Sequence, residues 1–458
     1  MSSYPRYAAE KIRRVSCLIS ILGLAACAQA AVQCVNPGVS SCFKTISAAV
    51  SGASPGDTIN VARGTYKEMV TIAQSLSLVG TDPNSTTIDA TGLSNAIYIN
   101  NGSSLVGNVV VTGFTIQNAN FEGILINGAS SVTIWGNHIV NNDRSLIPSP
   151  TSPTCPGLTE VYSFEGSEAN DCGEGIHLTN VSSSVISYNT VESNAGGILV
   201  SDETGPTFDN LIANNVVVNN VMDCGITVPS HSPFGVYHNT IKGNLVSGNG
   251  TSPLNGGGAG VGLFSPGGPT SNYGNSIVNN SLVGNGIAGV AIHTHAPGTE
   301  TLRDTVIAGN YIAGNGPDSD LGLSGSQGDG IALGIAGGNV GGFVISGNTF
   351  ENEAEDIAIS TDLPLQLTVT LNNFSQNSIA IDNLPGPIPP LVTGGAAVNA
   401  TENYWGCPEG PGPATATGRG ARATGCSTFV NVSNSTVLST PFLSNPLPEP
   451  RATPPVVP

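Results

Sequence analysis

The residues best able to do chemistry in this chain are a pair of histidines and two glutamates that open similar segments. The stretch "GVAIHTHAPG", residues 289–298, contains His293 and His295, two of the six histidines in the chain. On an extended backbone a His-X-His pair directs both imidazoles to one side, as a metal site or a proton relay requires. Glu122 in "EGILIN" and Glu174 in "EGIHLT" occupy equivalent places in two similar segments. Their chemistry depends on the elements that hold them.

The composition narrows the class of protein and its partners. Glycine is abundant, with 59 residues, and charged residues make up only 10% of the chain. Helical domains normally cover their surface with Lys, Glu, Arg and Gln, so this composition argues against one. The chain has only 13 basic residues and a net charge of −18. Such a surface is a poor match for the phosphate backbone, so we exclude nucleic acid as a partner. An acidic polysaccharide would need a bridging cation, and Ca²⁺ is the candidate cofactor.

The N-terminus has the pattern of an export signal. Basic residues precede the apolar stretch "VSCLISILGLAA", and the small residues of "CAQAA" follow it. We expect a signal peptide over residues 1–30, cleaved after "AQA" at Ala30. The competing interpretation takes "LAAC" as a lipobox and places a lipid anchor on Cys27. Both place the protein outside the cytoplasm, and no later segment is long and apolar enough to span a bilayer.

The cysteines that follow the signal suit an oxidising compartment. Their spacing favours three local disulfides and leaves Cys224 single. The expected pairs are Cys34–Cys42, Cys155–Cys172 and Cys407–Cys426.

Internal repetition predicts the fold. Stretches such as "VTIWGNHIVNN", "NLIANNVVVNN" and "TVIAGNYIAGN" alternate with stretches such as "EGILIN", "GGILVS" and "AGVAIH". Alternation of apolar and polar residues over a few positions is typical of strands. The shortest repeat distances lie in the low-to-mid twenties, enough for one turn of three short strands. We therefore predict an all-β chain, a single-stranded right-handed parallel β-helix of about ten coils over residues 97–382.

A column of asparagines recurs once in each repeat. We interpret it as structural, because Asn tolerates left-handed dihedrals at a turn and stacked amides can hydrogen-bond along a ladder. The column is expected at Asn137, Asn189, Asn215, Asn244, Asn280, Asn310, Asn348 and Asn373.

The two ends of the chain are expected to close the stack. Residues 31–96 should form an N-terminal cap and the first coils, with one short amphipathic helix over residues 43–51. An irregular C-terminal cap is expected over residues 383–437, and residues 438–458 should form a loose Pro-rich tail.

Three stretches resemble a known group of proteins. "TISAAVSGASPGDTINVARGTYKEMVTI" resembles the opening of bacterial right-handed β-helix proteins and of pectin methylesterases, and "ENYWGCPEGPG" is similar to a terminal motif of exported members. The repeats resemble the parallel β-helix repeat group of the pectin-lyase-like superfamily, which includes carbohydrate-active enzymes and NosD-like proteins. The resemblance implies the fold and a polysaccharide partner. It implies no activity, because the "DFIFG", "LGRPW" and "DPHD" types of motif are absent.

Aligning the repeats places one set of candidate residues at a loop-rich edge. Six positions beyond the strand glycine come Glu203, His231, Pro266 and His295, with Asp202 and His293 just before this column. Three interpretations remain open: a transition-metal site, a histidine general base (His231) beside a carboxylate, or solvated loop residues without a role. The metal-site candidates are Asp202, Glu203, His231, His293 and His295, and we expect both members of the His-X-His pair on the loop edge and not in a buried pocket.

A second column lies one position before the strand glycine. It is expected to contain Glu122, Glu174, Gly196, Cys224, Ala259, Ala288 and Asp329. When two carboxylates stack, the pKa of one of them rises or the pair recruits a cation. Paired carboxylates also serve glycoside hydrolysis. The catalytic candidates are Glu122, Glu174, His177 and His231. The alternative is that acidic residues simply precede strands at a polar turn. The insertion over residues 142–171 is expected to wall one side of a groove at this column.

Two functions remain open. The sequence favours an exported monomer that binds polysaccharide or serves as a surface scaffold without catalysis, because aromatic and basic residues are scarce. The alternative is a carbohydrate-active enzyme, a lyase, hydrolase or epimerase, with a carboxylate and histidine cleft on the β-helix.

Overall fold

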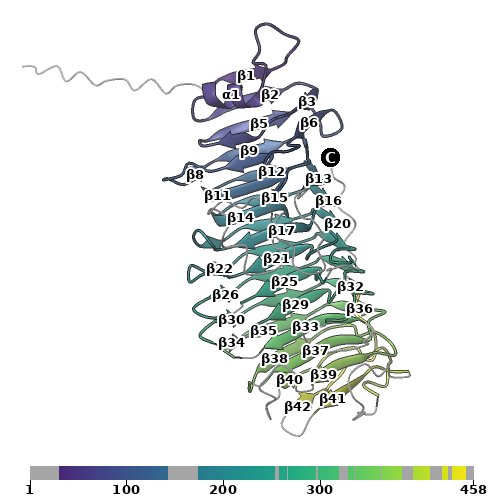
Figure 1. The fold of residues 1–458 in the computed structure, drawn as a ribbon. Coiled ribbons are helices and arrows are strands. Elements are labelled where there is room, and N and C mark those ends of the chain that lie inside the picture. Colours follow the sequence, from purple (N-terminus) through teal and green to yellow (C-terminus); the bar gives the residue numbers. More distant parts are fainter. Residues whose placement is uncertain are drawn as a thin grey trace, which may run out of the picture.

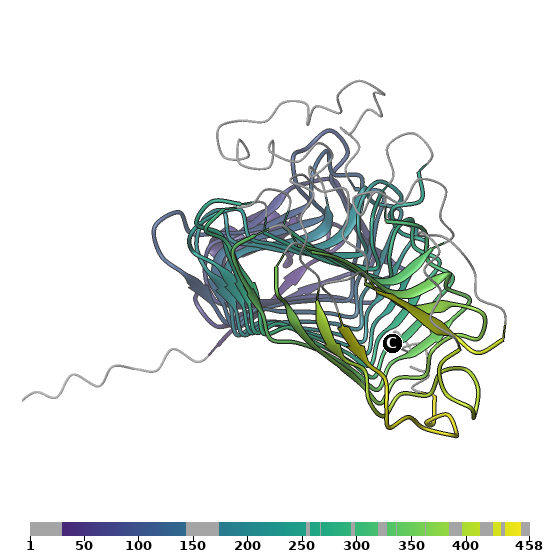
Figure 2. The ribbon, with the colours of Figure 1, turned by 90° about the horizontal axis from the view of Figure 1, so that it is seen from below.

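The computed structural model shows short parallel strands stacked coil upon coil along one axis (Figure 1). Viewed along the axis, successive coils superpose around one central core (Figure 2). The structure describes residues 30–142, 174–252, 257–265, 267–294, 298–318, 328–335, 337–361, 363–383, 396–412, 425–431 and 436–449.

Three parallel sheets form the faces of the coils. Sheet 1 consists of β1 (Val32–Val35), β2 (Asp57–Val61), β5 (Leu76–Gly80), β9 (Val109–Thr112), β12 (Thr133–Trp135), β15 (Val185–Ser187), β19 (Leu211–Ala213), β23 (Thr240–Lys242), β27 (Ser276–Val278), β31 (Val306–Ala308), β35 (Phe343–Ser346), β38 (Gln366–Thr370), β40 (Ala397–Asn399) and β42 (Thr436–Leu438). Sheet 2 consists of β3 (Gly64–Tyr66), β6 (Thr86–Asp89), β10 (Thr115–Gln117), β13 (His138–Val140), β16 (Thr190–Glu192), β20 (Val216–Val218), β24 (Leu245–Ser247), β28 (Ser281–Val283), β32 (Tyr311–Ala313) and β36 (Thr349–Glu351).

Sheet 3 carries the candidate residues. Its main strands are β4 (Val70–Ile72), β7 (Ile97–Ile99), β11 (Ile124–Ser130), β14 (Glu174–Ser182), β17 (Gly196–Ser201), β21 (Ile226–Pro229), β25 (Val261–Phe264), β29 (Val290–His293), β33 (Asp329–Ile335), β37 (Glu355–Thr361), β39 (Ile379–Asn383) and β41 (Thr428–Asn431). Short strands continue several coils beyond them: β8 (Val106–Gly107), β18 (Thr207–Phe208), β22 (Val236–Tyr237), β26 (Ser271–Tyr273), β30 (Thr301–Arg303) and β34 (Asn339–Gly341).

These sheets confirm the predicted right-handed parallel β-helix, and its strands extend beyond the expected core of residues 97–382 at both ends. Inward side chains at the middle of each strand fill the interior. In sheet 1 Ile134, Ile186 and Ile212 are wholly buried, and in sheet 3 Val290 and Ile292 are buried as the alternation predicts. The apolar column down the centre is the main source of stability, because each coil buries its inner face only against its neighbours.

The asparagine ladder is a continuous run of buried amide hydrogen bonds. The side-chain oxygen of Asn189 accepts from the backbone N–H of Asn137 at 3.0 Å and from its side-chain amide at 3.2 Å. Asn215 does the same for Asn189, at 3.0 and 3.1 Å. Each side-chain amide also donates to a backbone carbonyl of an earlier coil, as Asn189 does to Ile134 at 2.9 Å. The predicted structural role of the column is supported rung by rung.

Two details of the predicted ladder are wrong. The rung after Asn348 is Asn372, whose oxygen accepts from the Asn348 backbone at 2.9 Å, and not Asn373. The left-handed dihedral also belongs to the residue before the ladder position. Tyr188 has φ 55° and Leu371 has φ 60°, and these residues make the turn that aims the following asparagine inward.

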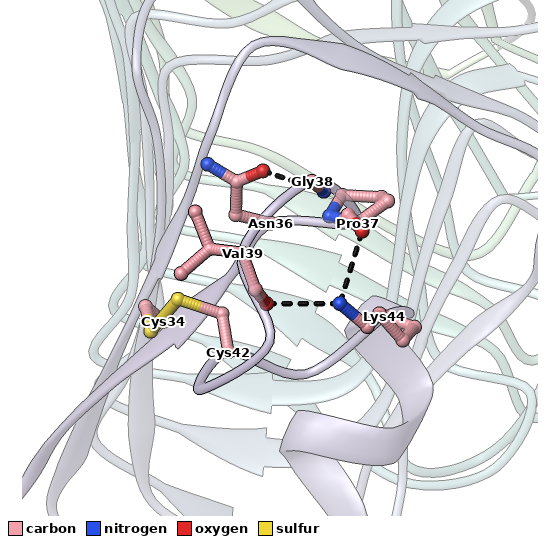
Figure 3. The surroundings of a disulfide bond; sticks show 7 residues. All are labelled: Cys34, Asn36, Pro37, Gly38, Val39, Cys42 and Lys44. Atoms are coloured by element: carbon pink, nitrogen blue, oxygen red, sulfur yellow. Dashed lines mark hydrogen bonds between the residues drawn. A yellow bond between two sulfur atoms is a disulfide. The ribbon is translucent and has the colours of Figure 1, made fainter.

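The N-terminal cap contains the expected helix, α1 (Ile46–Gly52), which starts three residues later than predicted. The Thr45 hydroxyl accepts from the Ala48 N–H at 3.2 Å and caps it. The predicted Cys34–Cys42 disulfide is present beside it, with the Lys44 ammonium donating to the carbonyls of Pro37 and Val39 at 2.9 Å each (Figure 3).

The C-terminal cap is held by the predicted Cys407–Cys426 disulfide and by the buried Trp405. Part of the expected tail is bound to the stack, because Leu447 donates its N–H to Asn373 at 2.8 Å and accepts from it at 2.9 Å. In the described ranges no helix has the length and apolar character that crossing a membrane requires.

Candidate functional site

The first strands of sheet 3 bring three of the four catalytic candidates together. The Gly123 N–H donates to the Glu174 carbonyl at 3.1 Å, which sets Glu122 against Glu174 on adjacent coils. His177 lies on the outward side of β14, three residues beyond Glu174. One carboxylate oxygen from each glutamate and one imidazole nitrogen lie within 4.8 Å of one another, and all three residues are wholly buried. We call Glu122, Glu174 and His177 the triad.

The two nitrogens of His177 have different environments. Nε2 lies 2.8 Å from the Ser201 hydroxyl, and that hydroxyl in turn donates to the Glu203 carboxylate. Because the hydroxyl proton is used on Glu203, the imidazole Nε2–H donates to Ser201. Nδ1 therefore is the nitrogen whose protonation can vary, and it faces the Glu122 carboxylate at 3.5 Å. This arrangement suits either proton exchange or metal ligation by Nδ1.

The fourth catalytic candidate, His231, is joined to the triad through Glu203. Its Nδ1 lies 2.8 Å from one oxygen of Glu203, while the other oxygen lies 3.8 Å from Nε2 of His177. Burial of the Glu203 carboxyl disfavours its ionisation, but hydrogen bonds and charge from the two histidines outweigh burial and hold its pKa below the usual range. A line of buried ionisable groups from Glu122 to His231 therefore runs across four coils.

Asp202 shapes the loop that presents His231. Its carboxylate accepts from the backbone N–H groups of His231 at 2.7 Å and Gly235 at 2.6 Å and from the Ser230 hydroxyl at 2.9 Å. Burial raises its pKa despite these hydrogen bonds. Since loop donors occupy both oxygens, Asp202 positions the loop and is a poor metal ligand.

The structure does not bring His293 to this group. In the register of sheet 3, Phe264 stands between Pro229 and His293, so a whole coil separates His293 from the loop of His231. His293 is 2% exposed and lies 2.8 Å from Asp318, so the expectation that it occupies an open loop edge is wrong. The imidazole of His293 is buried at the end of β29, with the Asp318 carboxylate as its partner. His295, Pro266, the Cys155–Cys172 pair and residues 143–171 of the insertion lie outside the described residues.

The donor set of the triad fits a transition metal better than Ca²⁺. Two carboxylates and one imidazole nitrogen are ligands typical of Zn²⁺ or Mn²⁺, whereas Ca²⁺ takes oxygen ligands. Among the described residues no donor hydrogen-bonds to either Glu122 oxygen, which leaves both available to a cation. The other close group, Cys407, Glu409 and Cys426, is unsuitable because its sulfurs form the disulfide.

Comparison with known proteins supports the fold. A model of the right-handed β-helix region matches residues 83–267. No curated protein matches the chain. The catalytic domain of a GH87 α-1,3-glucanase superposes with a TM-score of 0.51 at 12% identity, over 88% of this chain and 67% of that one. The chain folds as a right-handed parallel β-helix.

Two further solved structures are similar to this β-helix protein. The alginate lyase from Paenibacillus sp. str. FPU-7 has a TM-score of 0.49 and 15% identity, over 70% of this chain and 95% of that one. DFA-IIIase from Arthrobacter chlorophenolicus A6 also has a TM-score of 0.49, with 14% identity, over 90% of this chain and 99% of that one. At these identities the likeness concerns the fold alone.

The same column of the β-helix contains a second buried acidic pair further along. Asp329, at the predicted position, pairs in register with Glu355 on the next coil. Burial and the Glu355 charge raise the pKa of Asp329 to about 8. Burial also raises the pKa of Glu353 to about 7, against the hydrogen bonds from Asn315. Glu353 ends a second ladder, which runs through the asparagines five positions beyond those of the first.

This acidic pair predicts that stability falls as pH rises. Between the unfolded-state value near 4 and the raised value near 8, folded Asp329 binds a proton that the unfolded chain has lost. The free energy of unfolding should then decrease by up to about 1.4 kcal/mol per pH unit for each such group. Glu203 acts oppositely, because its stabilising contribution is lost as pH falls below about 4. Thermal unfolding should show a maximum midpoint under mildly acidic conditions.

Asp329→Asn tests this prediction, since it removes the titrating group and keeps the shape. The variant should show a smaller loss of thermal midpoint between pH 5 and pH 8 than the parent protein. Asp209→Asn is the matched control, because that carboxylate is exposed and should leave the profile unchanged. An unchanged slope in Asp329→Asn would contradict the assignment.

Sequence reasoning missed two contributors to the site, Ser201 and Tyr98, and also the partner of His293. Ser201 links His177 to Glu203, and Tyr98 lies one coil before Leu125 in the outward column that leads to His177. Extending the aligned column one strand earlier would have found Tyr98. Aligning the column two residues beyond His177 would have found Ser201. Asp318, the partner of His293, comes from a segment outside the repeat, and no pattern in the sequence marks it.

Proposed function

We propose that this protein is an exported polysaccharide-active enzyme that hydrolyses glycosidic bonds at the triad. The observation that carries the proposal is the approach of two carboxylates on adjacent coils, with an imidazole within 4.8 Å of both. Glycoside hydrolysis uses a carboxylate pair, and a histidine beside one member can move its proton. The similarity in fold to the catalytic domain of an α-1,3-glucanase supports this proposal. The Cys34–Cys42 disulfide is consistent with export.

The separation of the carboxylates favours one stereochemical course. Retaining glycosidases hold their carboxyl groups about 5 Å apart, whereas inverting enzymes leave room for a water at about 6.5–9.5 Å. In the triad one oxygen of each glutamate lies within 4.8 Å of the other, which favours the retaining course. In the proposed mechanism Glu122, which faces Nδ1 of His177, protonates the leaving oxygen. Glu174 attacks the anomeric carbon, and Glu122 then activates the water that releases the sugar.

A second candidate function is polysaccharide binding without catalysis, which the sequence favoured. The complete burial of Glu122, Glu174 and His177 supports this alternative, because a bond in a polymer must reach the groups that cleave it. A cation held by the triad would then reinforce the coils below a binding surface.

Product analysis separates the two functions. Purified protein is incubated with neutral and uronate polysaccharides, each with EDTA, Ca²⁺ or Zn²⁺, while reducing ends and unsaturated uronate absorbance are followed. We expect new reducing ends without unsaturated products, and proton NMR of the first product should show the anomeric configuration of the substrate. Unsaturated ends would identify a lyase instead. Binding without any product would favour the scaffold.

A further inference from the structure

A polar pocket lies on the same face as the triad, where the first coils of sheet 3 meet their loops. Its volume is about 460 Å³, within the range of about 300–1,000 Å³ that small-molecule sites occupy. The described residues that line it come from β7, β11, β14 and the loops after β7 and β17, on the side of the stack where β8 and β11 are labelled in Figure 1. They include the amides Asn100, Asn127 and Asn180, the hydroxyls Ser103, Ser104 and Thr204, and the aromatic ring of Tyr98.

The lining is uncharged and fixed in place. None of the described lining residues carries a charge. The Thr204 hydroxyl donates to the Asn127 side chain at 2.8 Å, and the Asn100 amide donates to the Asn127 carbonyl at 2.6 Å. These bonds hold amide and hydroxyl groups in one orientation, so a ligand does not have to order them.

A glycine keeps the floor of the pocket open. Gly128 has φ +74°, and a Cβ there would lie 3.7 Å from the Asn180 amide and 3.9 Å from both the Asn100 amide and Leu105. A larger side chain would therefore project among the lining groups. Leu105 is 59% exposed at the rim, where it offers an apolar surface beside the polar ones.

Two side-chain columns of sheet 3 lead from the pocket lining to the triad. Tyr98, Leu125 and His177 form one outward column in register, so the pocket wall and the imidazole are two coils apart, about 10 Å. The neighbouring column runs from Asn127 through Thr179 to Ser201, the hydroxyl that binds His177. Burial and then the Glu122 charge raise the pKa of Tyr98, which places the ring within the field of the triad.

We propose that this pocket is a subsite for a neutral sugar unit of the substrate. Amides and hydroxyls recognise sugar hydroxyls, while Tyr98 and Leu105 contact the C–H face of the ring. A uronate or phosphate group would need Arg, Lys or a cation, and the described lining supplies none. The inference rests on the proposed function and names its substrate class: a neutral glycan, bound with one unit in the pocket and the next bond towards the triad.

Calorimetric titration of the full chain tests the subsite with neutral and uronate oligosaccharides of equal length. Binding and cleavage are measured separately, and Glu174→Gln is used so that the ligand stays intact. We expect neutral oligosaccharides to bind and uronates to bind at least tenfold more weakly. Tyr98→Ala should weaken neutral binding roughly fivefold to tenfold and Tyr98→Phe by much less, because the ring supplies the contact. Tyr273→Ala, on β26 several coils further along sheet 3 and outside the pocket lining, is the control and should leave binding unchanged.

Ser103→Lys provides a gain-of-function test. Ser103 is exposed at the rim, so the change should not disturb folding. The added ammonium should raise uronate affinity several-fold and leave or lower neutral affinity, whereas Ser40→Lys in the N-terminal cap should do neither. Cleavage of a neutral glycan with no effect of Tyr98→Ala or Ser103→Lys would overturn the subsite and leave the proposed function standing. Equal or stronger uronate binding by the unchanged pocket would also overturn it, and neither binding nor cleavage of any glycan would overturn both.

Discussion

Replacing Glu174 by glutamine is expected to reduce glycan hydrolysis by about a thousandfold, near the middle of the range for loss of a catalytic carboxylate. Glutamine keeps the size of the side chain and its place at the start of β14, but it cannot form the glycosyl ester. Glu122→Gln should cause a loss of similar size, because the amide cannot deliver a proton to the leaving oxygen. Initial rates of reducing-end release measure both effects.

Glu192→Gln is the matched control for these variants. Glu192 lies on sheet 2, half-buried, with its carboxylate 2.8 Å from His138, so it shares the pairing with histidine without the second carboxylate. The rate of glycan hydrolysis by Glu192→Gln should stay within a factor of two of the rate of the parent protein. Thermal unfolding must show that all three variants remain folded. If folded Glu174→Gln retains more than a tenth of the parent rate, the triad is not the catalytic centre.

His177 offers a way to separate catalysis from metal binding at the triad. If a Zn²⁺ or Mn²⁺ ion supports the chemistry, EDTA should abolish activity and one equivalent of metal should restore it, with loss of that response in His177→Ala. If the carboxylates act alone, EDTA should have no effect. His177→Ala should then lower kcat whether or not EDTA is present, since the chain loses the imidazole that can exchange a proton with Glu122.

The sequence predicted the columns of sheet 3 well because the repeat itself determines them. Glu122 and Glu174 are neighbours although the chain between them includes a long insertion. In parallel coils, residues at the same phase of the repeat stack whatever loop separates them. The same reasoning placed Asp329 at its correct position in the column, and the structure shows Glu355 beside it.

Two predictions failed, one through the phase of the repeat and one through a contact outside it. At "LNNF" the sequence offers two consecutive asparagines, and Leu371 takes the left-handed turn, so Asn372 becomes the rung. The spacing does distinguish the two, because the rung lies three residues beyond a buried apolar residue, as Asn348 follows Ile345 and Asn372 follows Val369. His293 was misplaced for a different reason: its environment depends on Asp318, which comes from an irregular segment. Contacts between a repeat and a loop have no periodicity from which to infer them.

The ladder should be the feature of the scaffold most sensitive to substitution, and Asn215→Ala should destabilise the protein by about 3 kcal/mol or more. Asn215 accepts from the backbone and side-chain amides of Asn189, and its own amide donates to Asn244 and to the Ile186 carbonyl. Alanine leaves these buried partners without water or a substitute. Urea unfolding should report the loss, and Asn60→Ala, on an exposed strand position, should change stability by less than about 0.5 kcal/mol.

The position of the rung should matter as well as its chemistry. In a stacked repeat the stability depends on each coil and on the interfaces between neighbours, so a central break separates two blocks of coils. Asn215 lies in the middle of the stack, whereas Asn403 ends the same ladder by accepting from Asn372. Asn403→Ala should therefore fray only the C-terminal coils and leave the triad intact, with activity retained at temperatures where Asn215→Ala is already inactive. Equal effects of the two substitutions on activity would show that the whole β-helix unfolds as one unit.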